Sequence, residues 1–526
     1  KSGKIDYTEE SAPCKPQEPT FFDPCMGSGH ILVYAFDVLM QIYIECGYSE
    51  RDAAAEIVQN NLFGLDIDRR AMQLAYFSVM MKARQYDRRF LTRGIHPQVY
   101  CPMADAELTE YGSMTQVQAL EAKPVLPADA TLFEQDYDVK LNDWNVRRVL
   151  AKTYKVVCTN PPYLNKYNAK LKEFVNGNYK DYSGDLFSVF IYRNLQLCEE
   201  GGYCGYMTPN VWMFIKTYEK LRLFLLQEKS IVSLVQMAKG AFFKEATVDI
   251  CTLVLQNAAA RQAGLYFRLE DFKGDMEVQR QKVLEAIANP HCGYFYEAQQ
   301  ANFSKIPGCP IAYWISANFC AIFDNEKIGK YAISDGQTKT GDNDKYLRLI
   351  WEVNSNSVGK GLKWVLHAKG GAFRRWYGNV DTVIDWSDEA RNHYRSDHVA
   401  RIAPEYIWFR EGICWTLISS SALHGFRILD DRMTFNLAAP SVFFDDKEMM
   451  LYILGFLNTK LSNEIVSLLN PTLNTNISDI TVQPLIYKEG LQKDSVIYIV
   501  RDNVKVSKLD WDAYETSWDF KKHPLL

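Results

Sequence analysis

The sequence predicts an α/β chain in which a Rossmann-like, doubly wound domain with a mixed sheet is followed by an α+β domain. Short apolar strands alternate with amphipathic helices through the first half, which is typical of a parallel, doubly wound sheet. The first strand runs directly into a glycine-rich loop that opens a helix. After about residue 258, helical segments become sparse while aromatic residues and turns multiply. We therefore expect one domain over 1–257, a connector over 258–330 and a second domain over 331–526.

The predicted elements follow one another in a regular order. Strands are expected at 20–23, 62–66, 155–159, 202–207, 231–237 and 248–255. Helices are expected at 31–46, 69–84, 186–198 and 218–227, and in the second domain at 448–457 and 459–469. Ser49 is a candidate cap for a further helical stretch that runs through residue 59. The stretch 96–145 is polar and poorly periodic, so no element is predicted there.

The composition is that of an ordinary globular protein. The 526 residues are 47% hydrophobic, and this length indicates about two to four domains. The 12 cysteines include no Cys-x-x-Cys pair, so neither a metal site nor a disulfide framework is predicted, and a reducing, cytoplasmic setting is favoured. No apolar run approaches the ~18 residues of a membrane helix, so no membrane association is expected.

The glycine-rich loop indicates a ligand site at the end of the first strand. Gly27 and Gly29 permit a tight turn and close approach of a ligand to main-chain N–H groups, while the following helix directs its positive end at a carboxylate. Asp23 either accepts a hydrogen bond from an amino group of the ligand or organises the loop. Pro24 and Met26 complete the predicted cofactor-binding segment.

A second acidic position follows the next predicted strand. Asp66 stands where doubly wound sheets place a carboxylate that binds ribose hydroxyls, and Ile67 is expected to pack on an adenine face. Asp68 is the rival for the ribose role. For either acid the alternative is a charge that stabilises a helix N-terminus.

The sequence Asn160, Pro161, Pro162, Tyr163 indicates the function more specifically than the glycine-rich loop does. An exocyclic adenine amine is a poor nucleophile because its lone pair is delocalised into the ring. The side-chain carbonyl of Asn160 and the main-chain carbonyl of Pro161 would act as acceptors for that amine, with the proline rings fixing their direction. Tyr163 would stack on a base taken out of the duplex. With a sulfonium methyl donor, these residues predict methyl transfer to a nucleobase nitrogen.

The candidate nucleic-acid surface lies in the second domain. The net charge of −5 does not indicate a nucleic-acid binder, although a local basic surface suffices for binding. Residues 359–379 contain Lys369, Arg374 and Arg375, together with Lys360 and Lys363, no acidic residue and several aromatic ones. We predict contacts to DNA phosphates or guanine edges from this segment. The alternative is a solvated basic turn with core aromatics.

These motifs also carry a family resemblance. The segments DPCMGSGHILVYAFDVL (23–39), FGLDIDRRAMQLAYF (63–77), NPPYLNKY (160–167) and DLFSVFIYR (185–193) resemble the PglX-like adenine-specific DNA methyltransferases of BREX phage-exclusion systems. The resemblance is dense in the first half and looser in the second, through TGDN (340–343), FRRWYG (373–378) and LNPTLN (469–474). It implies use of S-adenosylmethionine for N6-adenine methylation of a specific double-stranded DNA sequence that marks host DNA, with other phage-exclusion proteins as partners.

The resemblance also assigns residues. Asp23, Gly27 and Gly29 match the methionine-end cofactor loop, Asp66 the ribose ligand and Asn160 to Tyr163 the catalytic clamp. The aromatic residue that sandwiches the target base matches Phe243, with Phe242 as rival, and both have a core role as the alternative. Asp185 is expected to line the same cleft, or else to cap a helix. Asp136 and Asp138 are candidates for the acid that contacts the cofactor adenine.

One departure from the family concerns the start of the chain. These enzymes carry a further cofactor-pocket segment before the first glycine loop, whereas here about 20 mostly polar residues precede Phe21, and the first residue is Lys1. We therefore expect an excised core with weakened cofactor affinity.

Two other function classes stay open. The same four-residue clamp occurs in methyltransferases that act on RNA or on glutamine side chains of proteins. The chain is alternatively a non-catalytic DNA-recognition subunit of a phage-exclusion complex that retains the fold.

Overall fold

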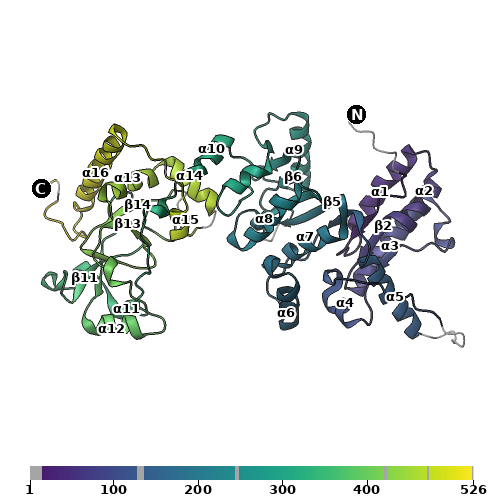
Figure 1. Ribbon diagram of the computed structural model, residues 1–526, viewed down its shortest axis with the longest axis horizontal. Helices are drawn as coiled ribbons and strands as arrows, with labels where there is room; N and C mark the ends of the chain where they lie inside the picture. The colour runs from purple at the N-terminus through teal and green to yellow at the C-terminus, as the bar shows by residue number, and fades with distance from the viewer. Residues whose placement is uncertain (1–14, 127–134, 243–247, 420–422, 471–472, 524) are drawn as a thin grey trace. The chain divides into compact units, whose positions relative to one another are not determined.

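The computed structural model describes residues 15–126, 135–242, 248–419, 423–470, 473–523 and 525–526. The chain forms two compact units (Figure 1). The first comprises Lys1–Ser304 and Ile311–Trp314, and the second Lys305–Pro310 and Ile315–Leu526.

A mixed sheet forms the centre of the first unit. Within the described residues it has nine strands in the order β3-β2-β1-β4-β5-β7-β6-β8-β9. The strands are β1 (Phe21–Asp23), β2 (Leu62–Leu65), β3 (Gln98–Tyr100), β4 (Tyr154–Thr159), β5 (Cys198–Pro209), β6 (Ser230–Gln236), β7 (Ile250–Gln256), β8 (Gly264–Arg268) and β9 (Phe295–Ala298). Strands β3, β2, β1, β4 and β5 are parallel, and β7 is antiparallel to β5. The predicted Rossmann-like fold with a mixed sheet is confirmed.

The strand order reverses between β1 and β4. The chain builds β1, β2 and β3 outward on one side and returns to place β4 on the other side of β1. In open α/β sheets a crevice forms at such a reversal, outside the carboxyl ends of the strands. The glycine-rich loop follows β1 and Asn160 follows β4, so the topology brings both predicted motifs to this point.

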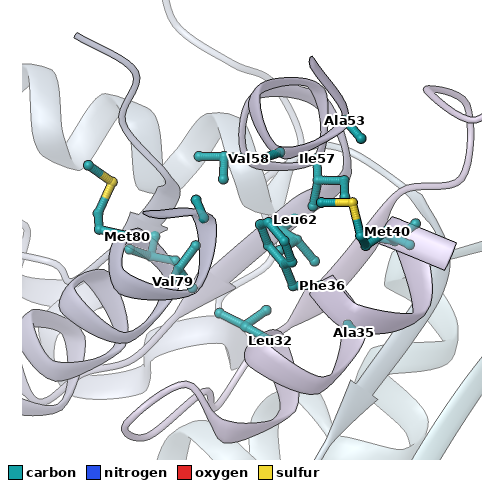
Figure 2. Packing of buried hydrophobic residues seen from close by; sticks show 14 of the residues in the cluster. Leu32, Ala35, Phe36, Met40, Ala53, Ile57, Val58, Leu62, Val79 and Met80 are labelled. Atoms are coloured by element: carbon teal, nitrogen blue, oxygen red, sulfur yellow. The ribbon is translucent and has the colours of Figure 1, made fainter. Parts of the chain in front are cut away.

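The described residues of the first unit also form helices. They are α1 (His30–Glu45), α2 (Glu50–Glu56), α3 (Arg69–Tyr86), α4 (Ala106–Tyr111), α5 (Gln135–Leu150), α6 (Ala169–Asn178), α7 (Leu186–Leu197), α8 (Glu219–Glu228) and α9 (Met276–Ala288). Ser49 caps α2 as predicted, and its hydroxyl accepts the Asp52 N–H. Leu32 and Phe36 of α1 meet Ile57, Leu62 and Val79 in a buried cluster (Figure 2). This core fixes α1, and with it the glycine loop, against α3 and β2.

Two stretches contain structure that the sequence did not predict. Residues 96–145 hold β3, α4 and part of α5, and residues 258–298 add β8 and β9 to the sheet. Strand β3 has only 3 residues, too few to show a period, and its pairing with β2 is a long-range contact. Tertiary pairing therefore decides β3 rather than local pattern.

The second unit is α+β, as predicted. Its described residues form a four-stranded sheet in the order β10-β12-β11-β15 and a three-stranded sheet in the order β14-β13-β16. The strands are β10 (Leu347–Leu349), β11 (Trp364–Ala368), β12 (Thr382–Asp385), β13 (Gly412–Trp415), β14 (Phe426–Leu429), β15 (Met433–Phe435) and β16 (Ser441–Phe443). The helices are α10 (Ala317–Ala321), α11 (Asn343–Tyr346), α12 (Asp388–Ser396), α13 (Lys447–Leu457), α14 (Lys460–Leu469), α15 (Ile477–Thr481) and α16 (Leu491–Trp511).

Candidate active site

The glycine loop is held tightly against α3. Gly29 has φ of +83°, and a Cβ atom at this position would lie 3.0 Å from the Ala75 backbone. Only glycine fits both the dihedral angle and the space. Gly29 is also the N-cap of α1, and no side chain caps that helix. The first-turn N–H groups of α1 are therefore directed at the space beside the loop.

Asp23 organises the loop from beneath. One oxygen of its fully buried carboxyl, Oδ1, accepts the Cys25 N–H at 3.1 Å and the Thr159 hydroxyl at 2.7 Å. The other oxygen, Oδ2, is buried and has no hydrogen-bond partner among the described residues. Burial raises the pKa of Asp23 to about 7. The carboxyl thus joins the glycine loop to the end of β4.

Asp66 fastens the same loop from β2. Its Oδ2 accepts the Gly27 N–H at 2.9 Å, and its Oδ1 accepts the Asp68 N–H at 2.8 Å. The Gly27 N–H is therefore engaged within the loop. Each carboxylate oxygen retains a second lone pair for a ribose hydroxyl. Asp68 is the N-cap of α3 and accepts the Arg70 N–H at 2.7 Å, which matches its predicted alternative.

Ile67 lies exposed beside this carboxylate. It is 60% exposed, and a Cβ at Gly112 would come within 2.6 Å of its Cγ2 atom. Gly112 therefore leaves the space in which the Ile67 side chain lies. An exposed branched side chain next to Asp66 is compatible with the predicted contact to an adenine face.

The predicted clamp begins where β4 ends. Asn160 is exposed, Pro161 is buried and Pro162 is exposed. The Tyr163 hydroxyl lies 3.1 Å from Asn160 Oδ1 and 2.9 Å from the Met207 carbonyl. Burial raises the pKa of Tyr163 above its usual range, so this hydroxyl is a proton donor, with one proton for these two acceptors. When it donates to Asn160, it directs the amide and leaves a second lone pair on Oδ1.

Asp185 supports the clamp from α7. Its Oδ1 accepts the Leu164 N–H at 2.8 Å and the Phe187 N–H at 3.3 Å. The Leu186 N–H donates in return to the Leu164 carbonyl at 3.0 Å. Asp185 is thus the N-cap of α7, the alternative that the sequence left open. Burial raises its pKa.

One cleft joins the glycine loop to the clamp. It has a volume of about 650 Å³. Its lining includes residues from the glycine loop, the ends of β4 and β5, strand β7 and the 242 position: Cys25, Met26, Gly27, Ser28, His30, Ile31, Cys158, Thr159, Asn160, Gly205, Tyr206, Met207, Phe242, Thr252, Leu253 and Val254. Phe242, the rival for the base-stacking role, is 44% exposed here. Phe243 lies outside the described residues.

Three supporting residues were not predicted. Thr159 donates to Asp23, and the Ser113 hydroxyl donates to the Pro24 carbonyl at 2.9 Å. The buried Arg193 guanidinium holds the segment around Ser113 by donating to the Ser113 and Thr115 carbonyls at 3.1 and 2.9 Å. The adjacency of Thr159 to Asn160 was a usable signal. Ser113 and Arg193 lie far apart in sequence and carried none.

The two other acids proposed for the cofactor lie on α5. Asp136 and Asp138 are exposed in its first turn, and Asp136 forms an ion pair with Lys140 at 2.6 Å. Neither belongs to the lining of the cleft.

In the second unit, the predicted basic residues have different environments. Arg374 forms an ion pair with Asp510 at 3.0 Å and lies over the Trp511 ring. Arg375 lies over Phe373, and its buried Nε has no partner among the described residues. Lys369 is half-buried next to Gly370. The segment is therefore partly engaged in the packing of its own unit.

Among the described residues, no group of three or more His, Cys, Asp or Glu side chains could hold a metal ion. No helix in that part of the chain is long and apolar enough to cross a bilayer.

Known proteins resemble this chain in sequence along its whole length. Residues 60–243 match the family model described as Eco57I restriction-modification methylase. The adenine-specific methyltransferase PglX of Lacticaseibacillus casei (strain Zhang) is 32% identical over 590 residues, which span 100% of this chain and 48% of that protein. The adenine-specific methyltransferase BrxX of Escherichia coli O9:H4 (strain HS) is 30% identical, over 98% of this chain and 47% of that protein. The chain thus spans about half the length of these relatives.

A solved structure shares the fold. The Type IIL restriction-modification enzyme MmeI, in complex with DNA, superposes with a TM-score of 0.54 and 12% identity, covering 96% of this chain and 67% of that one. The resemblance inferred from the motifs is confirmed, since this chain is similar along its length to the adenine-specific methyltransferases PglX and BrxX.

Proposed function

We propose that this chain transfers a methyl group from S-adenosylmethionine to the N6 atom of adenine at a specific sequence in double-stranded DNA. The observation that carries the proposal is the single cleft lined by both the glycine loop and Asn160. A methyl donor bound at the loop and an amine bound at the clamp would share that space, which is what direct group transfer requires.

The residues present fit the proposed cofactor. S-adenosylmethionine would supply an electrophilic methyl group on a sulfonium centre. The uncapped N-terminus of α1 lies at the cleft through His30 and Ile31 and suits the cofactor's carboxylate. The buried Oδ2 of Asp23, which has no hydrogen-bond partner among the described residues, suits a cationic amino group. Asp66 and the exposed Ile67 suit the ribose and adenine.

Asn160 and Pro161 would activate the target amine. Acceptors directed at an exocyclic amine draw its hydrogens out of the ring plane and localise the nitrogen lone pair. The Tyr163 hydroxyl and the Asp185 contact with Leu164 fix the two ends of the clamp. Tyr163 and Phe242 or Phe243 would stack on the extruded base.

The substrate class is supported by the relatives. PglX and BrxX are named adenine-specific methyltransferases, and the MmeI structure contains DNA. We extend this to marking of host DNA in phage defence, in the cytoplasm and with other proteins of a phage-exclusion system. Lys369 and Arg375 stay candidates for DNA contacts, whereas the ion pair with Asp510 engages Arg374.

The test is Asn160→Ala, with Asn165→Ala as matched control because Asn165 is an exposed asparagine in the same loop. Transfer of a tritiated methyl group to duplex DNA is expected to vanish in Asn160→Ala and to persist in Asn165→Ala, while both bind DNA like the wild type. Sequencing of modified bases in host DNA identifies the product. Full activity in Asn160→Ala, or transfer only to RNA or protein, would overturn the proposal.

A further inference from the structure

Two cations face each other in the second unit without an acid between them. Lys339 and Arg401 are partners in an antiparallel bridge, in which each N–H donates to the other residue's carbonyl at 2.8 Å. Both residues are exposed. Like charges directly opposite on neighbouring strands repel each other and destabilise the pairing.

Neither cation is neutralised within the described part of the chain. No carboxylate there forms an ion pair with Lys339 or Arg401, in contrast to Arg374, which pairs with Asp510 at 3.0 Å, and Arg395, which pairs with Glu405 at 2.8 Å. The two cations line a hollow of about 390 Å³. Its lining contains no acidic residue: Gly336, Gln337, Lys339, Arg401, Ile402, Leu437 and Ile477.

An exposed leucine is held rigidly beside this pair. Leu437 is 50% exposed, at a turn closed by Asn436, whose Oδ1 accepts the N–H groups of Ala438 and Ala439 at 2.9 and 3.1 Å. Asn436 also bridges Thr338, the neighbour of Lys339. The turn therefore presents an apolar side chain beside the two cations.

The predicted basic segment adjoins the same turn. A Cβ at Gly370 would lie 2.9 Å from the Ala438 carbonyl, so Lys369 is next to the Leu437 turn. We call Lys339, Arg401 and Leu437 the Leu437 face. It combines two cations with one exposed leucine, and both cations come from parts of the chain that the sequence did not single out.

We propose that the Leu437 face binds the sugar–phosphate backbone of duplex DNA, with Lys339 and Arg401 sharing phosphates and Leu437 against sugar or groove atoms. This inference rests on the proposed function, because a DNA-modifying chain must hold duplex. Phosphate oxygens supply the anions that the repelling pair lacks. Such contacts position the duplex without reading its sequence.

The test uses a fluorescent duplex of mixed sequence, so that no knowledge of the recognised site is needed. Binding of Lys339→Gln/Arg401→Gln is measured by anisotropy over a series of salt concentrations. Arg501→Gln/Lys505→Gln is the matched control, since it removes the same charge from exposed positions on α16. Loss of two phosphate contacts lowers the slope of log K against log salt by about 2 and weakens binding about 30-fold at about 0.15 M salt.

Each outcome decides the inference. It is supported if only the Lys339/Arg401 variant loses slope and affinity while its thermal unfolding midpoint is unchanged or higher, because repulsion is relieved. Leu437→Ala should weaken binding about fivefold at unchanged slope. The inference is overturned if the Lys339/Arg401 variant binds duplex like the wild type, or if the affinity of the control variant falls by the same factor. It is also overturned if the wild type binds no duplex, or if the variant loses binding to polyglutamate and not to DNA. Methyl transfer is assayed separately, so a wild type that binds duplex through this face and methylates nothing refutes the proposed function alone.

Discussion

Replacement of the buried Asp23 by asparagine should change stability in a way that depends on pH. Burial raises the Asp23 pKa from its usual 3.8 to about 7. Between these two values the folded state holds a proton that the unfolded state has lost, so the stability of the wild type falls as pH rises through this window. The full difference corresponds to about 4 kcal/mol, at about 1.4 kcal/mol per pH unit.

The asparagine in the Asp23→Asn variant would keep the accepting oxygen for Cys25 and Thr159 and would carry no charge. Its amide nitrogen would be an unpartnered buried donor, which costs about 1–3 kcal/mol at every pH. The stability of Asp23→Asn minus that of the wild type is therefore expected to rise by about 3 kcal/mol between pH 5 and pH 8. The constant cost of the amide cancels in this comparison.

Hydrogen exchange of peptides that cover β1 and β4 measures this difference locally. Wild type and variant are compared at the same pH, so intrinsic exchange rates cancel. Asp87→Asn is the control, because Asp87 is also buried but forms an ion pair with Arg93 at 2.6 Å, and its loss should destabilise throughout. A constant difference between Asp23→Asn and wild type from pH 5 to pH 8 would refute the assignment of a neutral, buried Asp23.

Three further substitutions test the site and the second unit. Asp185→Ala removes the acceptor for the Leu164 N–H and the cap of α7. We expect the free energy of unfolding to fall by about 1–2 kcal/mol and kcat to fall at unchanged DNA affinity, and we expect Asp185→Asn to restore both. Equal kcat in wild type and both variants would exclude a positioning role. Gly29→Ala places a methyl group 3.0 Å from the α3 backbone at φ of +83° and should weaken S-adenosylmethionine binding measured by calorimetry. Gly47→Ala, at φ of +87° in open space, should leave that binding unchanged. Equal binding by the two variants would contradict the close packing of the loop. Arg374→Ala breaks an ion pair to α16 and should lower the unfolding midpoint without changing the salt dependence of DNA binding. A reduced slope of log K against log salt would instead show that Arg374 contacts a phosphate.

The regular part of the first unit could be predicted because local pattern and tertiary structure agree there. Apolar strands that end at Asp23 and Thr159 became β1 and β4, and parallel pairing of Phe22 with Val157 brings their ends together. Both motifs are local in sequence. Their meeting in one cleft follows from the strand order, which the alternation of strands and helices indicated only in general terms.

The supporting contacts could not be predicted because they join residues far apart in sequence. Ser113 reaches the Pro24 carbonyl across 89 positions, and Lys339 pairs with Arg401 only after two loops fold together. Arg374 illustrates the reverse case. Its basic neighbourhood indicated a DNA contact, but a distant carboxylate on α16 engages its guanidinium.

Three features of this structure destabilise the folded state for one shared reason. Each is a charge or dipole that no opposite charge within the described part of its own unit neutralises. Asp23 has a buried oxygen without a partner among the described residues, α1 begins without a side-chain cap, and Lys339 faces Arg401. Proteins retain such destabilising features where a ligand relieves them. The chemistry that would relieve each one differs: a cation at Asp23, an anion at α1 and phosphates at the Lys339–Arg401 pair. A zwitterionic sulfonium cofactor and a DNA duplex would together supply all three, so these three features lie where the proposed reaction needs charge.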